Sequence, residues 1–119
     1  MDKNIKILIV DDSIFMRNVL KNILVTAGYS QFIEGGTGIE AISLIADQKP
    51  NLVLLDLIMP EMGGIEVLKQ VGKTQKIVVI SAVGQDKIIE EAKTLGASGY
   101  IIKPFDINQV IHEIEAAMK

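Results

Sequence analysis

Five short apolar runs, separated by longer segments with a helical repeat, constrain the fold of this chain more than any other feature. The runs lie at residues 5–10, 31–34, 52–55, 77–80 and 100–102. Several are apolar at consecutive positions, as expected of strands buried on both faces. Between them, apolar residues recur every three or four positions, which predicts amphipathic helices. Because alternating strands and helices favour a parallel sheet covered on both sides, we expect an α/β fold with five strands and five helices.

Polar residues and glycines mark the ends of the expected helices. Thr37 and Glu40 form a capping-box pattern at the start of the second helix, and Asp106 offers a similar start to the last one. Gly28 and Gly96 stand where helices commonly end in a left-handed residue. These signals place the helix ends independently of the apolar pattern.

Length and composition exclude several classes of protein. The chain has 119 residues, which suits one domain over residues 1–119, and its net charge of −3 argues against direct binding of nucleic acid. It contains no cysteine, so disulfides and thiolate chemistry are excluded. The first apolar run is too short for a signal peptide, and no run approaches the ~18 apolar residues of a membrane span. We therefore expect a cytoplasmic protein without membrane insertion.

Chemically active side chains follow four of the expected strands at their carboxyl ends, where open α/β sheets bind their ligands. In chain order they are Asp11 with Asp12, Asp56, Ser81 and Lys103. The second strand has no clear chemical candidate at its end. Three carboxylates, a hydroxyl and an ammonium group are therefore expected to converge on one edge of the sheet.

This combination of groups suits a metal ion and a phosphoryl group. Three neighbouring carboxylates cannot all ionise without cost unless a cation compensates them. All-oxygen ligands suit Mg²⁺, which also binds phosphate oxygens, and Lys103 adds a further positive charge. One carboxylate could then attack phosphorus and become an acyl phosphate. Each side chain alone could be a turn former, a helix cap or a solvated lysine, but their occurrence together favours the functional interpretation.

These motifs resemble those of the receiver domains of two-component response regulators, and the resemblance covers the whole chain. ILIVDDS matches the family's acidic pair, LVLLDLIMPEMGG its phosphoacceptor strand and loop, VVISA its hydroxyl position, and GYIIKPF its lysine and proline. The resemblance is to the stand-alone, CheY-like type. It implies a flavodoxin-like, doubly wound five-stranded sheet with strand order 2-1-3-4-5. One departure is Gly63, where the family usually has Asp in the turn.

The resemblance implies a role for each side chain. Asp56 would accept a phosphoryl group from the phosphohistidine of a histidine kinase, and Lys103 and Ser81 would contact that group. Tyr100 would be an aromatic switch that turns inward when Ser81 moves. The switch would reshape the face made by the fourth helix, the fifth strand and the fifth helix. The peptide bond between Lys103 and Pro104 would be cis.

The resemblance also implies a metal site and a path for water. Mg²⁺ would be held by Asp12, Asp56 and the backbone carbonyl of Ile58, and by Asp11 either directly or through a water. In the family, the residues two positions beyond the phosphoacceptor and two beyond the hydroxyl flank the approach of a hydrolytic water. Here they are Ile58 and Val83, which cannot hydrogen-bond a water, so we expect slow loss of the phosphoryl group.

The implied partners follow from the same resemblance. A sensor histidine kinase or phosphotransfer protein would supply the phosphoryl group, and the effector would be a flagellar motor switch or another phosphorelay protein. A phosphatase could act as a further partner, and the family's single-domain members are commonly monomers. The protein would catalyse its own phosphorylation and dephosphorylation, which makes it a signalling switch more than a turnover enzyme.

Two other interpretations are open at this point. The segment GTGIEA at residues 36–41 fits the dinucleotide fingerprint G-x-G-x-x-A, with Asp56 about 20 residues further on. A dinucleotide fold normally has its glycines after the first strand, however, where this chain has Asp11 and Asp12. The other alternative is a pseudo-receiver, an interaction module that keeps the fold without the chemistry. Such a protein would tend to lack Asp12, Asp56 or Lys103, and all three are present.

Overall fold

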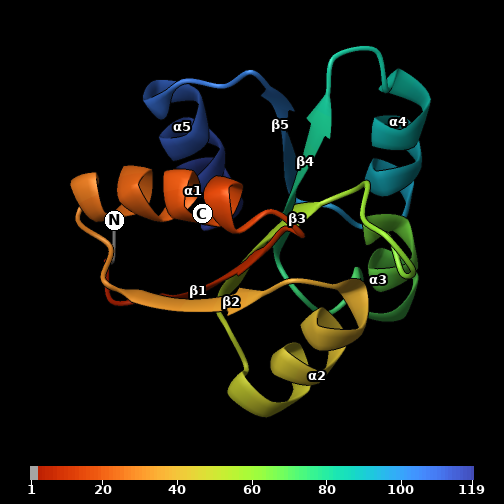
Figure 1. Ribbon diagram of the computed structural model, residues 1–119, viewed down its shortest axis with the longest axis horizontal. Helices are drawn as coiled ribbons and strands as arrows, with labels where there is room; N and C mark the ends of the chain where they lie inside the picture. Colours follow the sequence, from red (N-terminus) through yellow and green to blue (C-terminus); the bar gives the residue numbers. More distant parts are fainter. Residues whose placement is uncertain (1–2) are drawn as a thin grey trace.

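The computed structural model describes residues 3–119, in which strands and helices alternate (Figure 1). The strands are β1 (Lys6–Val10), β2 (Gln31–Gly35), β3 (Leu52–Asp56), β4 (Ile77–Ala82) and β5 (Gly99–Lys103). The helices are α1 (Ile14–Thr26), α2 (Gly38–Gln48), α3 (Gly64–Val71), α4 (Asp86–Thr94) and α5 (Ile107–Ala117). The expected alternation of five strands and five helices is confirmed. Over residues 3–119, none of the helices combines the length and apolar character needed to cross a membrane.

The sheet has the topology that the resemblance implied. All neighbouring strands pair in parallel, and their order is β2-β1-β3-β4-β5. Helices α1 and α5 cover one face of the sheet, and α2, α3 and α4 cover the other (Figure 1). From β1 the chain adds β2 on one side, whereas from β3 it adds β4 and β5 on the other side. The helices that follow β1 and β3 therefore lie on opposite faces of the sheet. This reversal in strand order opens a crevice at the carboxyl edge, where ligands bind in sheets of this kind.

The central strands are buried on both faces, which accounts for their consecutive apolar residues. Ile7 and Ile9 of β1 pack in the core layer beneath α1 and α5, whereas Leu8 and Val10 pack in the layer beneath the other three helices. All four side chains are fully buried. Burial of one such side chain stabilises the fold by about 1.5–3 kcal/mol. A polar substitution in this strand would therefore destabilise the fold.

The helix ends lie where their capping residues predict. Thr37 Oγ1 accepts a hydrogen bond of 3.1 Å from the Glu40 backbone N–H, and Asp106 Oδ1 accepts one of 2.8 Å at the start of α5. Gly28 and Gly96 follow α1 and α4 with φ of +104° and +109°, a conformation that side chains rarely adopt. The cis bond expected before Pro104 is also present.

The fourth strand is longer than the sequence indicated. Residues 77–80 were expected, but β4 continues to Ala82, so Ser81 lies inside the strand. Ser81 pairs with Ile102 of β5, and Ala82 pairs with Lys103. A polar side chain does not end a strand when its backbone still has a partner, and β5 supplies that partner.

Candidate functional site

Three aspartates meet at the carboxyl ends of β1 and β3, beside the reversal in strand order. Asp11, Asp12 and Asp56 each place one carboxylate oxygen within 4.8 Å of the other two. Asp11 and Asp56 are buried, with 1% and 6% of their surface exposed, whereas Asp12 is exposed. The structure therefore brings together the carboxylates that the sequence places after separate strands.

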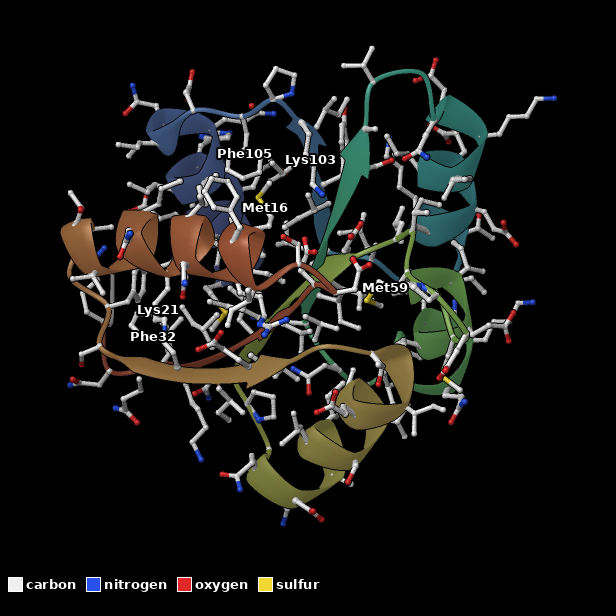
Figure 2. All side chains as sticks on the ribbon, viewed as in Figure 1. Met16, Lys21, Phe32, Met59, Lys103 and Phe105 are labelled. Atoms are coloured by element: carbon white, nitrogen blue, oxygen red, sulfur yellow. The ribbon has the colours of Figure 1, made fainter. Side chains whose placement is uncertain are left out.

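Lys103 supplies positive charge to this cluster from β5. Its Nζ lies 3.6 Å from Asp11 Oδ2 and 3.8 Å from Asp56 Oδ2. Figure 2 shows the side chain reaching from β5 toward the ends of the central strands. One ammonium group cannot neutralise three carboxylates, so the cluster retains an excess of negative charge.

Asp56 is the carboxylate whose ionisation the site changes most clearly. Burial raises the pKa of Asp56 from 3.8 to about 6, and the neighbouring charge of Asp11 acts in the same direction. A hydrogen bond of 3.2 Å from the Ile58 backbone N–H and the charge of Lys103 oppose this rise in pKa. An added cation would favour the ionised form, in which the carboxylate is a nucleophile.

The residues of the cluster fit a divalent cation with oxygen ligands. Asp11 Oδ1 accepts a hydrogen bond of 2.9 Å from the Ser13 backbone N–H. Asp11 Oδ2 is buried and has no hydrogen-bond partner among the described residues. The ammonium group of Lys103, 3.6 Å away, compensates the charge of this atom in part, and a cation would supply a direct contact. All-oxygen ligands suit Mg²⁺, so the geometry agrees with the metal expected from the sequence.

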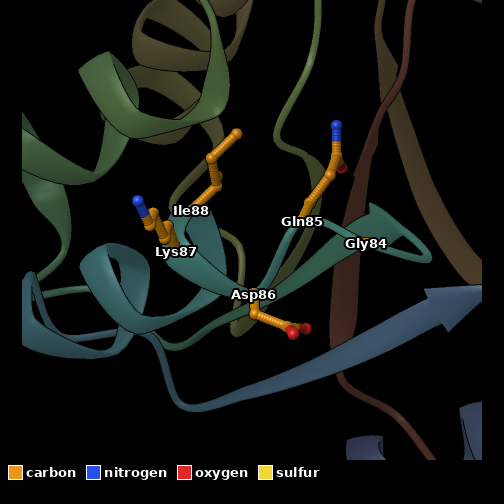
Figure 3. A pocket seen from close by; sticks show the side chains of 5 residues that line it. All are labelled: Gly84, Gln85, Asp86, Lys87 and Ile88. Atoms are coloured by element: carbon orange, nitrogen blue, oxygen red, sulfur yellow. The ribbon is translucent and has the colours of Figure 1, made fainter.

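The hydroxyl group of Ser81 lies at the end of β4 and is held by a residue that the sequence did not single out. Ser81 Oγ donates a hydrogen bond to Gln85 Oε1, and the Ala82 backbone N–H donates to the same oxygen at 2.9 Å. Figure 3 shows Gln85 at the start of α4. The only signal for Gln85 in the sequence is its place four residues after Ser81, which alone points to no function.

Comparison with known proteins agrees with this geometry. The family profile of the response regulator receiver domain matches residues 7–115. This chain belongs to the response regulator receiver domains.

The receiver domain has relatives of similar length. The chemotaxis protein CheY of Listeria monocytogenes is 38% identical over 118 residues, covering 97% of this chain and 99% of that protein. The sporulation initiation phosphotransferase F of Bacillus subtilis is 37% identical over 110 residues, covering 90% and 88%. Among solved structures, the chemotaxis response regulator CheY4 of Vibrio cholerae matches with a TM-score of 0.85 and 28% identity, covering 96% and 98%.

The second strand of the receiver domain contributes a residue that the sequence pattern does not single out. Glu34 of β2 forms ion pairs with Arg17 Nε at 3.0 Å and Lys21 Nζ at 2.8 Å. The hydrogen bond from Lys21 and the interactions with Arg17 lower the pKa of Glu34, whereas burial opposes them. Arg17 Nη1 also donates a hydrogen bond of 2.6 Å to the backbone oxygen of Asp11. Through Arg17, this network connects Glu34 of β2 to the backbone of Asp11 in the acidic cluster.

Three further side chains expected at the receiver site are at least partly exposed. Tyr100 of β5 is 37% exposed, and Lys93 Nζ of α4 lies 4.7 Å from the centre of its ring. Ile58 and Val83, which follow β3 and β4, are 54% and 72% exposed. The inward movement of Tyr100 and the metal contact of the Ile58 carbonyl stay predictions.

The glycines of the dinucleotide-like segment have structural roles in this receiver domain. The Gly36 backbone N–H donates a hydrogen bond of 3.2 Å to Glu40 Oε1, which completes the cap of α2. A Cβ at Gly38 would lie 2.4 Å from the backbone oxygen of Met62, so only glycine fits this approach to the loop after β3. The close packing accounts for Gly38 without a nucleotide, and the backbone of Gly36 takes part in the helix cap.

Proposed function

We propose that Asp56 is the phosphoacceptor of this receiver domain, whose family has a phosphoacceptor signalling role. The observation that carries the proposal is the position of Asp56. Its buried carboxylate lies within 4.8 Å of the other two acidic groups and 3.8 Å from an ammonium group, at the edge of the sheet where ligands bind. A buried carboxylate with an elevated pKa at such an edge is typical of a functional group.

The reaction is a transfer of a phosphoryl group between two side chains. A carboxylate oxygen of Asp56 attacks the phosphorus of a phosphohistidine, and a new P–O bond forms as the P–N bond breaks. The electron pair of the P–N bond returns to the imidazole, which leaves neutral if its other nitrogen carries a proton. Lys103 lies where its charge offsets that of the phosphoryl oxygens, and Ser81 contributes a hydroxyl donor.

Mg²⁺ is the proposed cofactor, held by Asp11, Asp12, Asp56 and the backbone carbonyl of Ile58. The close approach of the three carboxylates supports this assignment, as does the buried Asp11 Oδ2, which accepts no hydrogen bond among the described residues. When bound, Mg²⁺ supplies positive charge that offsets the negative charge of the phosphoryl oxygens. Little covalent work is left to the protein in such a transfer, so positioning and charge account for most of the rate.

The proposed partners are a histidine kinase or phosphotransfer protein as donor and an effector that binds the face formed by α4, β5 and α5. We propose that residues 1–119 act as one domain in the cytoplasm and switch between two states rather than turn over a substrate. Relatives named as a chemotaxis protein and as a sporulation phosphotransferase support a place in phosphoryl-based signalling. A motor switch and a further phosphorelay protein are therefore the two effector classes to test.

Incubation with acetyl phosphate and Mg²⁺ tests the proposed nucleophile. We expect the wild-type protein to take up one phosphoryl group, as measured by intact mass spectrometry, and Asp56→Asn to take up none. Asp47→Asn, which changes an exposed aspartate of α2, is the matched control and should label like wild type. Labelling of Asp56→Asn to the same stoichiometry would contradict the assignment.

A further inference from the structure

We propose that Gln85 is a positioning residue. It holds the Ser81 hydroxyl by a hydrogen bond until Asp56 carries a phosphoryl group. The inference rests on the proposed function, because it concerns how Ser81 reaches a group carried by Asp56. Its basis is the pair of hydrogen bonds that the Gln85 side chain accepts from the end of β4. We name this pair of contacts the Gln85 latch.

The orientation of the Gln85 amide follows from its partners. The backbone N–H of Ala82 can only donate, and its acceptor in the side chain of Gln85 lies at 2.9 Å. That atom must therefore be the amide oxygen, since the amide nitrogen cannot accept. The Ser81 hydroxyl contacts the same oxygen and must donate its hydrogen to it.

A serine hydroxyl has one hydrogen, so Gln85 Oε1 and a phosphoryl oxygen compete for it, and the backbone oxygen of Ala82, 3.5 Å from Ser81 Oγ, is a longer alternative. While Ser81 donates to Gln85, it cannot donate to a phosphoryl oxygen on Asp56. Ser81 is 1% exposed, which leaves little room for water to take over either contact. A charged phosphoryl oxygen is a stronger acceptor than a neutral amide, so the exchange becomes favourable only after Asp56 is loaded.

The loop that carries Gln85 has room to release the latch. Gly84 has a φ of +92°, and a Cβ placed on it would meet none of the described atoms within 4 Å. Residues 84–88 line a hollow with a volume of about 430 Å³ (Figure 3). The Gln85 side chain also makes no capping hydrogen bond to α4 in the described chain, so its release would not uncap that helix.

Loss of the Gln85 latch should therefore favour the state in which Asp56 carries a phosphoryl group or its mimic. A neutral hydrogen bond contributes about 1 kcal/mol, which corresponds to a change of about fivefold in an equilibrium constant. Gln85→Ala should bind beryllofluoride, a stable mimic of the phosphoryl group, about fivefold more tightly than wild type at saturating Mg²⁺. Gln85→Glu should bind it more weakly, because a carboxylate accepts from Ser81 more strongly and repels the anion.

The experiment is a calorimetric titration of beryllofluoride into wild type, both variants and a matched control. Gln70→Ala removes an exposed glutamine of α3 and should leave the affinity unchanged. In a Ser81→Ala background, Gln85→Ala should have no effect, since no hydroxyl remains to be released. Mg²⁺ affinity without beryllofluoride should be the same in wild type and Gln85→Ala, which separates positioning from a general change in structure.

The outcomes distinguish the latch from the proposed function. Unchanged or weaker binding by Gln85→Ala would overturn the latch, as would an effect that persists without the Ser81 hydroxyl. Tighter binding by Gln85→Glu would also overturn it. If wild type does not bind beryllofluoride, or if Asp56→Asn binds it equally well, the proposed function itself fails and the latch fails with it.

Discussion

At the scale of single residues, Asp56 combines two requirements that oppose each other. A nucleophilic carboxylate must be ionised, yet this one is 6% exposed and lies in a cluster with Asp11 and Asp12. Burial is the main cause that raises the pKa of Asp56 to about 6. The group that the proposed reaction requires therefore destabilises the folded chain at neutral pH unless a cation is bound.

Replacement of Asp56 by Asn should stabilise the protein in a pH-dependent way when divalent cations are removed. Because the pKa of Asp56 is higher in the folded state, the contribution of this group to stability falls as pH rises from about 3.8 to about 6 and is constant above that window. A pKa of about 6 in place of 3.8 corresponds to at most about 3 kcal/mol. The free energy of unfolding of wild type and Asp56→Asn, measured by urea denaturation with a chelator between pH 4 and 8, checks this. A difference that does not grow with pH would contradict it.

Addition of Mg²⁺ should raise the stability of wild type, because the ion binds the folded state and relieves carboxylate repulsion. At ~100 times its Kd the gain is about 3 kcal/mol in the free energy of unfolding. Asp12→Ala should lose most of this gain, whereas Asp47→Ala, outside the cluster, should keep it. Thermal melts at increasing Mg²⁺ measure the effect. An unchanged melting temperature of wild type at millimolar Mg²⁺ would show that the cluster is not a metal site.

The lifetime of the phosphoryl group should depend on the two apolar side chains beside the site. Ile58 and Val83 are 54% and 72% exposed, and neither can orient a water for attack on phosphorus. Ile58→Asn combined with Val83→Glu should speed the loss of the group several-fold at equal Mg²⁺. Val25→Glu, at an exposed position of α1, serves as the control. Decay of the acyl phosphate followed over time decides the question, and equal rates in the double variant and wild type would exclude these side chains.

At the scale of the elements, α4 and the residue that precedes it contact both residues of the expected switch. Gln85 precedes the helix and holds Ser81, and Lys93 near its end places Nζ 4.7 Å from the ring of Tyr100 on β5. Contacts of this cation–π kind contribute about 0.5–1 kcal/mol at exposed sites. We propose that both contacts favour the state without a phosphoryl group.

Removal of the Lys93 contact should shift Tyr100 toward the buried position expected of the switched state. Lys93→Met keeps much of the side chain but removes the charge, so the population of the inward ring should rise about two- to fivefold. The chemical shifts of the Tyr100 ring protons during a beryllofluoride titration report that population. Lys87→Met, on an exposed lysine of the same helix, is the control. Identical ring shifts in wild type and Lys93→Met throughout the titration would show that the contact has no such effect.

The elements also show why the sequence predicted some features and not others. The runs around Ile7 and Leu52 indicated strands because both faces of the sheet are covered, and Thr37 marked a helix start because its cap is local. Strand order came from the resemblance, since apolar runs do not say which strand lies beside which. Gln85 and Glu34 were missed because their partners depend on how loops and strands meet in three dimensions.

At the scale of the whole molecule, the sheet connects the acidic cluster to the proposed effector face. The β3 strand that carries Asp56 pairs with β4, which carries Ser81 and pairs in turn with β5. β3 is buried along its whole length, and α5 packs on β5. A rearrangement at the carboxyl edge can thus reach α4, β5 and α5 through directly paired elements.

We propose above all that a phosphoryl group on Asp56 changes the conformation of the face formed by α4, β5 and α5. Amide chemical shifts recorded with and without beryllofluoride, at saturating Mg²⁺, test it most directly. We predict larger changes over residues 82–108 than over the distal part of α1, and no such changes in Asp56→Asn. Changes confined to residues that contact the ligand would contradict the account, because the site would then bind a phosphoryl mimic without switching anything.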